Sequence, residues 1–170
     1  LLSTSTLTVT QTAGILSLNA GSGTIANLYA ITTGVKPVQK LPRQPLVWMQ
    51  RAKISSLNTT HSVLEMGFGN PVTNAAVVGV GAFFRLSTAG QMRTVLSYAS
   101  AEVEAIVTGP DATTEYYNYS VFVDDDNARF IIQEPDGTII SDTVMNLALA
   151  ATPSIFSSSH VAPFNRVYVD

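Results

Sequence analysis

Residues 121–132, with the sequence VFVDDDNARFII, place three aspartates and an asparagine between two runs of apolar and β-branched residues. The alternation of apolar side chains on both sides of the acidic segment predicts two β-strands. Aspartate and asparagine tolerate the tight bends of a hairpin, so Asp124–Asn127 is predicted to be a turn. A calcium loop would instead space its oxygen ligands at alternate positions around a glycine, and no glycine follows Asp126. The turn is the favoured interpretation, and a weak cation site shared with another loop stays open.

Short strands separated by turns are predicted along most of the chain. Strand-like segments include LVWMQRAKIS at 46–55, AVVGVGAFFRLS at 76–87 and EYYNYSVFV at 115–123. The glycines of the second segment indicate close backbone packing or a bulge. The segment MNLALAA at 145–151 is the only helical candidate. Many short strands with a turn about every ten residues predict an all-β protein, an antiparallel β-sandwich or jelly roll.

Three parts of the chain are expected. Residues 1–34 carry no charge, and Leu, Ile and Val recur among Ser and Thr, which predicts an uncharged N-terminal arm or small sheet that packs on other subunits. Residues 35–45 contain three prolines, which favour extended backbone and remove ladder donors, so this segment is predicted to be a connector. Residues 46–170 hold the predicted sandwich domain.

Charge is scarce and unevenly distributed. Charged residues make up 12% of the 170, about half of the roughly 25% that is usual. Residues 1–100 hold seven basic residues and one acid, Glu65, whereas residues 101–170 hold two basic residues and eleven acids. Either the two halves neutralise one another within one domain, or the polarity produces complementarity between copies of the protein. Nucleic-acid binding is disfavoured, because the acidic half would repel phosphate.

Several classes of site and targeting segment are disfavoured by composition. The chain has no cysteine, which excludes disulfides and thiolate metal sites. No apolar run approaches the roughly 18 residues that span a bilayer, so we expect no membrane segment. The opening LLSTST lacks the charged n-region of a signal peptide and is typical of a mature product or a trimmed fragment.

Glu102 and Glu104, in the segment EVE, place two carboxylates on the same face of a predicted strand. Glycosidases use two carboxylates at a defined separation, so this pair is a candidate catalytic site. The segment lacks the full E-x-D-x-E strand of laminarinase-type jelly-roll glycosidases, and one tryptophan cannot line a cleft. His61 and His160 have no H-x-H or H-x-x-x-H partner, so we expect loop residues rather than metal ligands. The expectation is a protein without catalytic activity, metal or cofactor.

Three tyrosines lie in the strand-like segment 115–123. Alternation places Tyr117 and Tyr119 on one face and Tyr116 on the other. Rows of tyrosines form stacking platforms for sugars, and they also cover half-buried sheets. Both interpretations stay open.

Four segments together resemble a known family: SVLEMGFGNP at 62–71, GAFFRL at 81–86, EYYNYSVFVDDDNARFII at 115–132 and FNRVYVD at 164–170. With Trp48 on an early strand, they are similar to the concanavalin A-like jelly-roll modules of tailed-bacteriophage virion proteins. The resemblance covers roughly residues 45–170. It implies a virion component, either a capsid decoration or cement protein or part of a head or tail fibre, and commonly a trimer.

Two functional hypotheses follow. In the first, the protein is a non-enzymatic structural component of the virion, and its arm binds capsid or tail proteins and sister subunits. The residues expected at that interface are Leu7, Val9, Ile15, Leu16, Leu18, Ile25, Leu28, Tyr29, Lys36, Lys40 and Arg43. In the alternative, the domain is a lectin-like module that recognises a host surface glycan. The residues expected near the glycan are Tyr116, Tyr117, Tyr119, Asp124, Asp125 and Asp126.

Overall fold

A computed structural model describes the backbone of most of the chain. The described residues are 8–12, 15–19, 29–33, 38–39, 41–54, 62–70, 78–87, 90–98, 101–107, 115–150 and 160–169. They form thirteen β-strands and one short 3-10 helix, and the strands pair in antiparallel fashion. Within the described residues, no helix has the length and hydropathy needed to cross a membrane.

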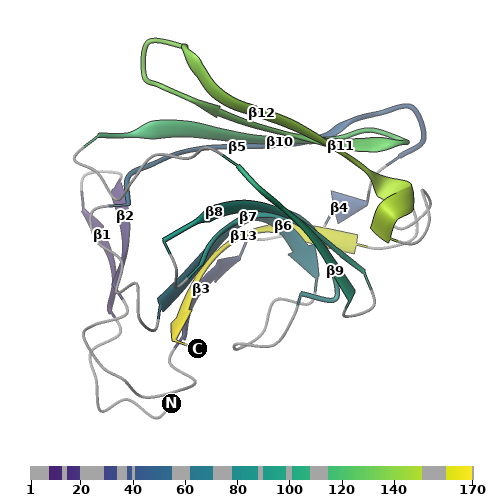
Figure 1. Cartoon of the computed structure of the whole chain (residues 1–170). Helices are drawn as coiled ribbons and strands as arrows, with labels where there is room; N and C mark the ends of the chain where they lie inside the picture. The colour runs from purple at the N-terminus through teal and green to yellow at the C-terminus, as the bar shows by residue number, and fades with distance from the viewer. Residues whose placement is uncertain are drawn as a thin grey trace.

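The strands form one large sheet, one small sheet and a separate two-stranded sheet (Figure 1). The large sheet has the order β3 (Tyr29–Thr33), β13 (His160–Val169), β6 (Ser62–Asn70), β7 (Val80–Leu86), β8 (Met92–Tyr98) and β9 (Ala101–Ile106), and β4 (Val38–Gln39) also pairs with β13. The small sheet has the order β12 (Ile139–Asn146), β11 (Asn127–Gln133), β10 (Tyr117–Val123) and β5 (Leu46–Ala52). The two-stranded sheet consists of β1 (Thr8–Thr12) and β2 (Ile15–Asn19).

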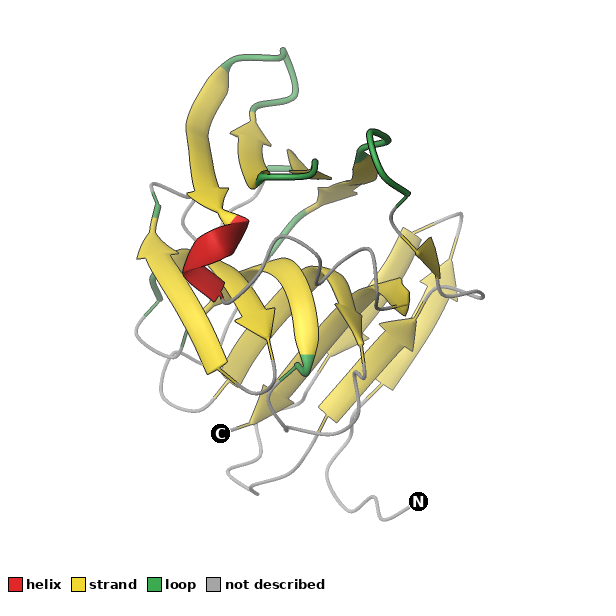
Figure 2. Ribbon diagram, turned by 90° about the vertical axis from the view of Figure 1, so that its right-hand side faces the viewer, coloured by secondary structure: helices red, strands yellow, loops and turns green. Residues whose placement is uncertain are grey.

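The small and large sheets lie face to face as two layers, so the predicted all-β jelly-roll sandwich is confirmed (Figure 1). The large sheet arches, and its concave side is turned away from the small sheet (Figure 1). The predicted helical segment forms the 3-10 helix η1 (Leu147–Ala150), which follows β12 and contacts β8 and β9 (Figure 2).

Aromatic side chains join the two layers in the core. Phe84 of β7 packs edge-on against Tyr119 of β10, with ring centroids 5.5 Å apart, and against Phe130 of β11, at 5.4 Å. Trp48 of β5 is buried in the same cluster. Alternate residues of β6, β7, β10 and β11 supply this core, because successive side chains point to opposite faces of a sheet. The period-two pattern of the sequence therefore encodes the inner face of each layer.

The acidic segment is a turn, as predicted. The backbone N–H of Asp124 donates to the carbonyl of Asn127 at 2.9 Å. The Asp124 carboxylate accepts the backbone N–H groups of Asp126 and Asn127, at 2.8 and 2.6 Å. This turn joins β10 to β11 and fixes their register, in which Val123 is opposite Ala128.

The N-terminal part contributes directly to the large sheet. β3, which lies within the predicted arm, pairs with β13 from Phe164 to Tyr168. β4, which lies within the predicted connector, pairs with His160 and Val161 of β13. His160 therefore belongs to a strand, and the expectation that it is a loop residue was wrong. His61 lies outside the described residues.

Two glycines allow close contact between neighbouring strands. A Cβ added at Gly81 would lie 2.7 Å from the carbonyl oxygen of Phe68, which confirms the predicted close backbone packing. Gly67 of β6 lies between its cross-strand partners Phe83 and Phe164. The rings of these two phenylalanines meet edge-on, with centroids 5.5 Å apart. An added Cβ at Gly67 would lie 2.7 Å from Cα of Phe83, so no side-chain rotation could relieve the clash.

We expect Gly67→Ala to lower the free energy of unfolding by about 2–3 kcal/mol, because it combines overpacking with an unfavourable positive φ. Gly137→Ala is the control, since Gly137 has a φ of +95° but no heavy atom within 4 Å of an added Cβ. That variant measures backbone strain alone, and we expect a loss of about 1 kcal/mol. Urea denaturation of both variants provides the measurement, and equal losses would contradict the packing argument.

Candidate functional site

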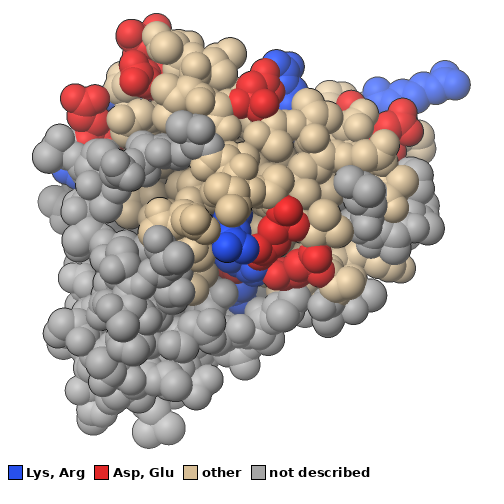
Figure 3. All heavy atoms as spheres, in the orientation of Figure 1, with Lys and Arg blue, Asp and Glu red and all other residues tan. Residues whose placement is uncertain are grey.

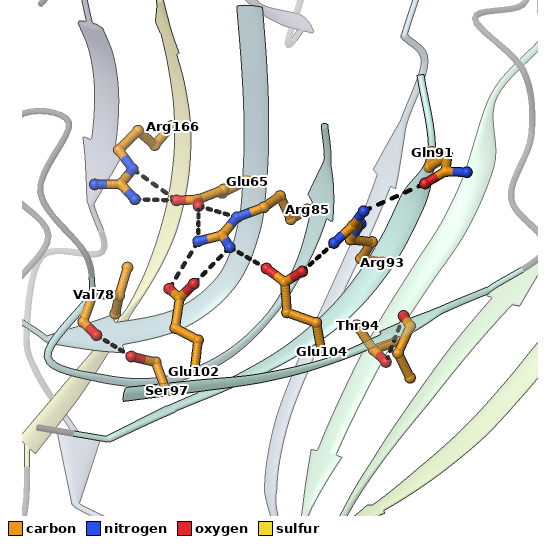
Figure 4. Close-up of polar contacts among 11 residues, drawn as sticks. Glu65, Val78, Arg85, Gln91, Arg93, Thr94, Ser97, Glu102, Glu104 and Arg166 are labelled. Atoms are coloured by element: carbon orange, nitrogen blue, oxygen red, sulfur yellow. Dashed lines mark hydrogen bonds and ion pairs between the residues drawn. The ribbon is translucent and has the colours of Figure 1, made fainter. Parts of the chain in front are cut away.

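Six charged side chains gather on the concave face of the large sheet (Figure 4). They are Glu65, Arg85, Arg93, Glu102, Glu104 and Arg166, here called the charge cluster. Strand pairing explains the gathering. Arg166 is opposite Glu65, Glu65 is opposite Arg85, and Arg85 is opposite Arg93, so one row crosses four strands.

Glu65 lies between two arginines and has no exposed surface. One of its carboxylate oxygens accepts a hydrogen bond from Nε of Arg166 at 2.8 Å, and the other accepts one from Nε of Arg85 at 2.7 Å. Arg166 is also fully buried. A buried charge is tolerated when it is paired and hydrogen-bonded, and here both conditions hold.

β9 supplies the carboxylates that balance the remaining positive charge. Glu102 binds both terminal nitrogens of Arg85, at 2.7 and 2.8 Å. Glu104 accepts hydrogen bonds from Arg85 and from Arg93. The cluster thus contains three arginines and three glutamates and carries no net charge.

The arginines keep the β9 carboxylates ionised. Burial alone would raise the pKa of Glu104, but hydrogen bonds and charge from Arg93 and Arg85 outweigh it and lower the pKa below the ordinary 4.5. A general acid in glycoside hydrolysis needs a raised pKa instead. The predicted placement of Glu102 and Glu104 on one strand face is correct, but both side chains are occupied by arginines. This geometry favours a stabilising role over acid catalysis.

The charge cluster also pairs basic residues of the first half of the chain with acidic residues of the second half. Arg85 and Arg93 come from the basic half of the chain, and Glu102 and Glu104 come from the acidic half. Glu65, the one acid of the first half, binds Arg166 from the second. For these residues, the two halves neutralise one another within the domain. Figure 3 shows basic and acidic side chains side by side at several places on the face in view.

The outer face of the small sheet has a different character. Pairing arranges its outward side chains in three rows: Val47–Phe122–Arg129–Val144, Met49–Ser120–Ile131–Asp142 and Arg51–Asn118–Gln133–Ile139. The first two rows are largely apolar, with Met49 66% and Val144 59% exposed. Their charges, Arg129 and Asp142, bind each other at 2.8 and 2.5 Å.

A surface hollow of about 320 Å³ lies over the second and third rows. Its lining residues are Met49, Gln50, Arg51, Asn118, Tyr119, Ser120 and Gln133. Its accessible outward groups are therefore a guanidinium, two amides and a thioether, whereas Ser120 is buried. Such a mixture can hydrogen-bond a polar ligand while the methionine contacts its apolar parts.

The structure separates the residues that were predicted to contact a glycan. Tyr116 precedes β10 and Asp124 follows it, so about 8 residues of extended chain, roughly 26 Å, lie between them. Tyr119 is only 1% exposed and packs in the core, so its ring is not a surface platform. Tyr117 packs against the same core. Tyr117 and Tyr119 therefore fit the alternative interpretation, in which the tyrosines cover a half-buried sheet.

The other predicted site residues have these positions. Tyr116 is half-buried, and its ring lies 5.5 Å from the guanidinium carbon of Arg51 and 5.6 Å from Nζ of Lys53. Asp125 accepts the backbone N–H of Arg43 at 3.0 Å. Among the described residues, no group of His, Asp and Glu side chains could hold a metal ion.

Five residues of the predicted subunit interface belong to N-terminal strands. Val9, Ile15, Leu16, Leu18 and Tyr29 belong to β1, β2 and β3, whereas Leu7, Ile25, Leu28, Lys36 and Lys40 lie outside the described residues. Arg43 is exposed in a turn before β5, with a φ of 61°. The interface stays a prediction.

Sequence reasoning missed Arg51, Asn118 and Gln133 as a group. A signal for two of them was present, because the turn at Asp124–Asn127 sets the hairpin register and places Asn118 opposite Gln133. Arg51 joins them through the pairing of β5 with β10. The strands are distant in sequence, so that pairing leaves no local signal.

No protein-family model matches the chain, and no curated protein matches its sequence. Solved structures do match its fold. The carbohydrate-binding module CBM66 from Bacillus subtilis has a TM-score of 0.56 and 9% identity, and the match covers 97% of this chain and 89% of that one. The CBM2 module of the evolved Dit protein of Lactobacillus casei BL23 phage J-1 has a TM-score of 0.56 and 13% identity, over 97% and 71%. The Emp46p carbohydrate recognition domain has a TM-score of 0.53 and 8% identity, over 85% and 72%.

We expect the stability of the protein to decrease in acid partly because of Glu104. Its folded-state pKa lies below 4.5, so the unfolded chain takes up the proton first as the pH falls. The stabilisation is complete above the unfolded pKa and is lost as the pH falls through the lower folded-state value. Urea denaturation at a series of pH values should show a shallower acid dependence for Glu104→Gln. An unchanged dependence would show that Glu104 does not contribute.

Proposed function

We propose that this chain is a non-enzymatic carbohydrate-binding module of a bacteriophage particle. The hollow on the small sheet is the observation that carries the binding function. Arg51, Asn118 and Gln133 present hydrogen-bonding groups from three adjacent strands, and Met49 supplies an apolar wall. Rigid strands hold these groups in fixed relative positions, which reduces the entropy lost on binding a polar ligand.

The state of the carboxylates supports binding rather than catalysis. Glu102 and Glu104 are held by Arg85 and Arg93, and the lowered pKa of Glu104 does not suit a proton donor. The fold comparisons add support of a second kind. The three structures described above are named as carbohydrate-binding or carbohydrate recognition modules, and one of them belongs to a phage protein.

We expect Asn118→Ala and Gln133→Ala each to weaken glycan binding about tenfold, because each variant removes hydrogen bonds worth roughly 1–1.5 kcal/mol. A glycan array probed with the wild-type chain identifies the ligand, and titration calorimetry then measures the variants. Gln44→Ala is the matched control, since Gln44 is an exposed amide outside the hollow. Normal affinity in both hollow variants would exclude the hollow as the glycan site.

The virion structural role is a second candidate function, and the separate sheet formed by β1 and β2 favours it. Neither strand pairs with the sandwich strands in the described part of the chain. A hairpin of two strands is marginally stable alone in water, so contact with other proteins would help to stabilise it. We propose that this hairpin attaches the module to capsid or tail proteins and to sister subunits, in an assembly that we expect to be trimeric.

Deletion of residues 1–19 removes β1 and β2 but keeps β3 in the large sheet. We expect the shortened protein to fold, with its core intact by circular dichroism, and to fail to incorporate into particles. Quantitative immunoblotting of purified particles measures incorporation. Wild-type incorporation of a folded deletion variant would remove the support for this role.

A further inference from the structure

Two exposed cations lie beside the hollow without a carboxylate. Arg85, Arg93, Arg129 and Arg166 each bind a glutamate or an aspartate. By contrast, Arg51 and Lys53 each lie over the ring of Tyr116, and neither forms an ion pair within the described part of the chain.

The row of outward residues that contains Arg51 supplies no carboxylate to this guanidinium. The third row contains Arg51, Asn118, Gln133 and Ile139, with no acid among them. The acid of the second row, Asp142, is bound by Arg129, whose hydrogen bond lowers the pKa of that carboxyl. An anion that enters the hollow therefore meets a guanidinium, while the acid in the adjacent row is already neutralised.

The geometry of the donors indicates which anion fits. A guanidinium presents parallel N–H groups that match the two oxygens of a carboxylate. The amides of Asn118 and Gln133 each donate one N–H to a backbone carbonyl, that of Glu134 and that of Gly137, both at 3.5 Å. Their oxygens and their second N–H groups suit hydroxyl groups. Met49 is 66% exposed and offers an apolar surface to the C–H groups of a sugar ring.

We propose that the hollow binds a carboxylate-bearing saccharide, such as a uronic acid unit of a surface polysaccharide. Arg51 binds the carboxylate, Asn118 and Gln133 bind hydroxyl groups, and Lys53 adds attraction at the edge beside Tyr116. This inference rests on the proposed glycan-binding function. It adds that the ligand is negatively charged and that Arg51 is the residue that recognises this charge. The protein carries a formal net charge of −3, so an acidic ligand is attracted by this local arrangement and not by the molecule as a whole.

Calorimetric titration of the full chain with three defined oligosaccharides tests the proposal. They are an oligogalacturonate, the neutral galactose oligomer of the same length and linkage, and a sulfated galactose oligomer. We expect the uronate to bind at least tenfold more tightly than the neutral oligomer, and its affinity to fall as salt is raised. The sulfated oligomer should bind more weakly than the uronate, because the site is matched to a planar carboxylate.

Substitutions of single residues identify the side chain that recognises the charge of the ligand. Arg51→Gln should weaken uronate binding at least tenfold and reduce the preference for the uronate over the neutral oligomer, and Arg51→Lys should restore only part of the loss. Arg43→Gln is the matched control, because Arg43 is an exposed arginine that does not line the hollow. Arg51 is exposed, so its replacement should not disturb folding, and thermal melts check this directly.

The outcomes separate this inference from the proposed function. Equal binding of the uronate and the neutral oligomer, lost together in Asn118→Ala, would overturn the acidic ligand and leave glycan binding in place. Preferential uronate binding that is unaffected by Arg51→Gln would overturn the site. Tighter binding of the sulfated oligomer would show that the site prefers a sulfate to a carboxylate, and this result would overturn the proposed ligand. If none of the three binds and a glycan array is also blank, the proposed function itself fails.

Discussion

The carboxylate of Glu65 is the constraint on which the charges of the large sheet depend. It is fully buried and needs positive partners, which Arg166 and Arg85 supply from the two neighbouring strands. Two arginines on one carboxylate leave one excess positive charge. Glu102 and Glu104 of β9 add two negative charges, and Arg93 of β8 adds the positive charge that brings the sum to zero. The cluster is neutral because its three arginines and three glutamates balance one another. Removing Glu65 would take this carboxylate away from the fully buried Arg166, and breaking a buried ion pair in this way typically costs about 3–5 kcal/mol.

This neutralisation determines which polar groups of the protein are available to bind a ligand. On the concave face the arginines and glutamates satisfy one another, so few of their groups are free for a ligand or a reaction. On the opposite side of the sandwich, the third row of the small sheet carries Arg51 next to two amides and a hollow. The same antiparallel register produces both results. In the large sheet it brings opposite charges together, and in the small sheet it aligns polar groups that do not neutralise each other.

Local sequence patterns predicted the parts of this structure that local physics determines. Strand periodicity predicted the sandwich, and the acidic segment predicted the turn between β10 and β11. The structure adds the register of this hairpin, in which Asn118 is opposite Gln133. Alternation also placed Glu102 and Glu104 on one face. The partners of Glu65 were not predictable, because Arg166 lies 101 residues away and only the pairing of β6 with β13 brings them together. For the same reason Arg51 could not be assigned to the hollow, although it is a neighbour of Asn118 in space.

The internal pairing of charges also limits how copies of the protein could recognise one another. The contrast between a basic first half and an acidic second half suggested attraction between subunits, yet Glu65, Arg85, Arg93 and Arg166 are already bound within the domain. The first two rows of the small sheet are largely apolar, with Met49 and Val144 more than half exposed and Arg129 bound to Asp142. Contacts made by such a surface depend on shape and on the removal of apolar area from water, and salt does little to weaken them. An assembly through these two rows would therefore draw its specificity from shape more than from long-range electrostatic attraction.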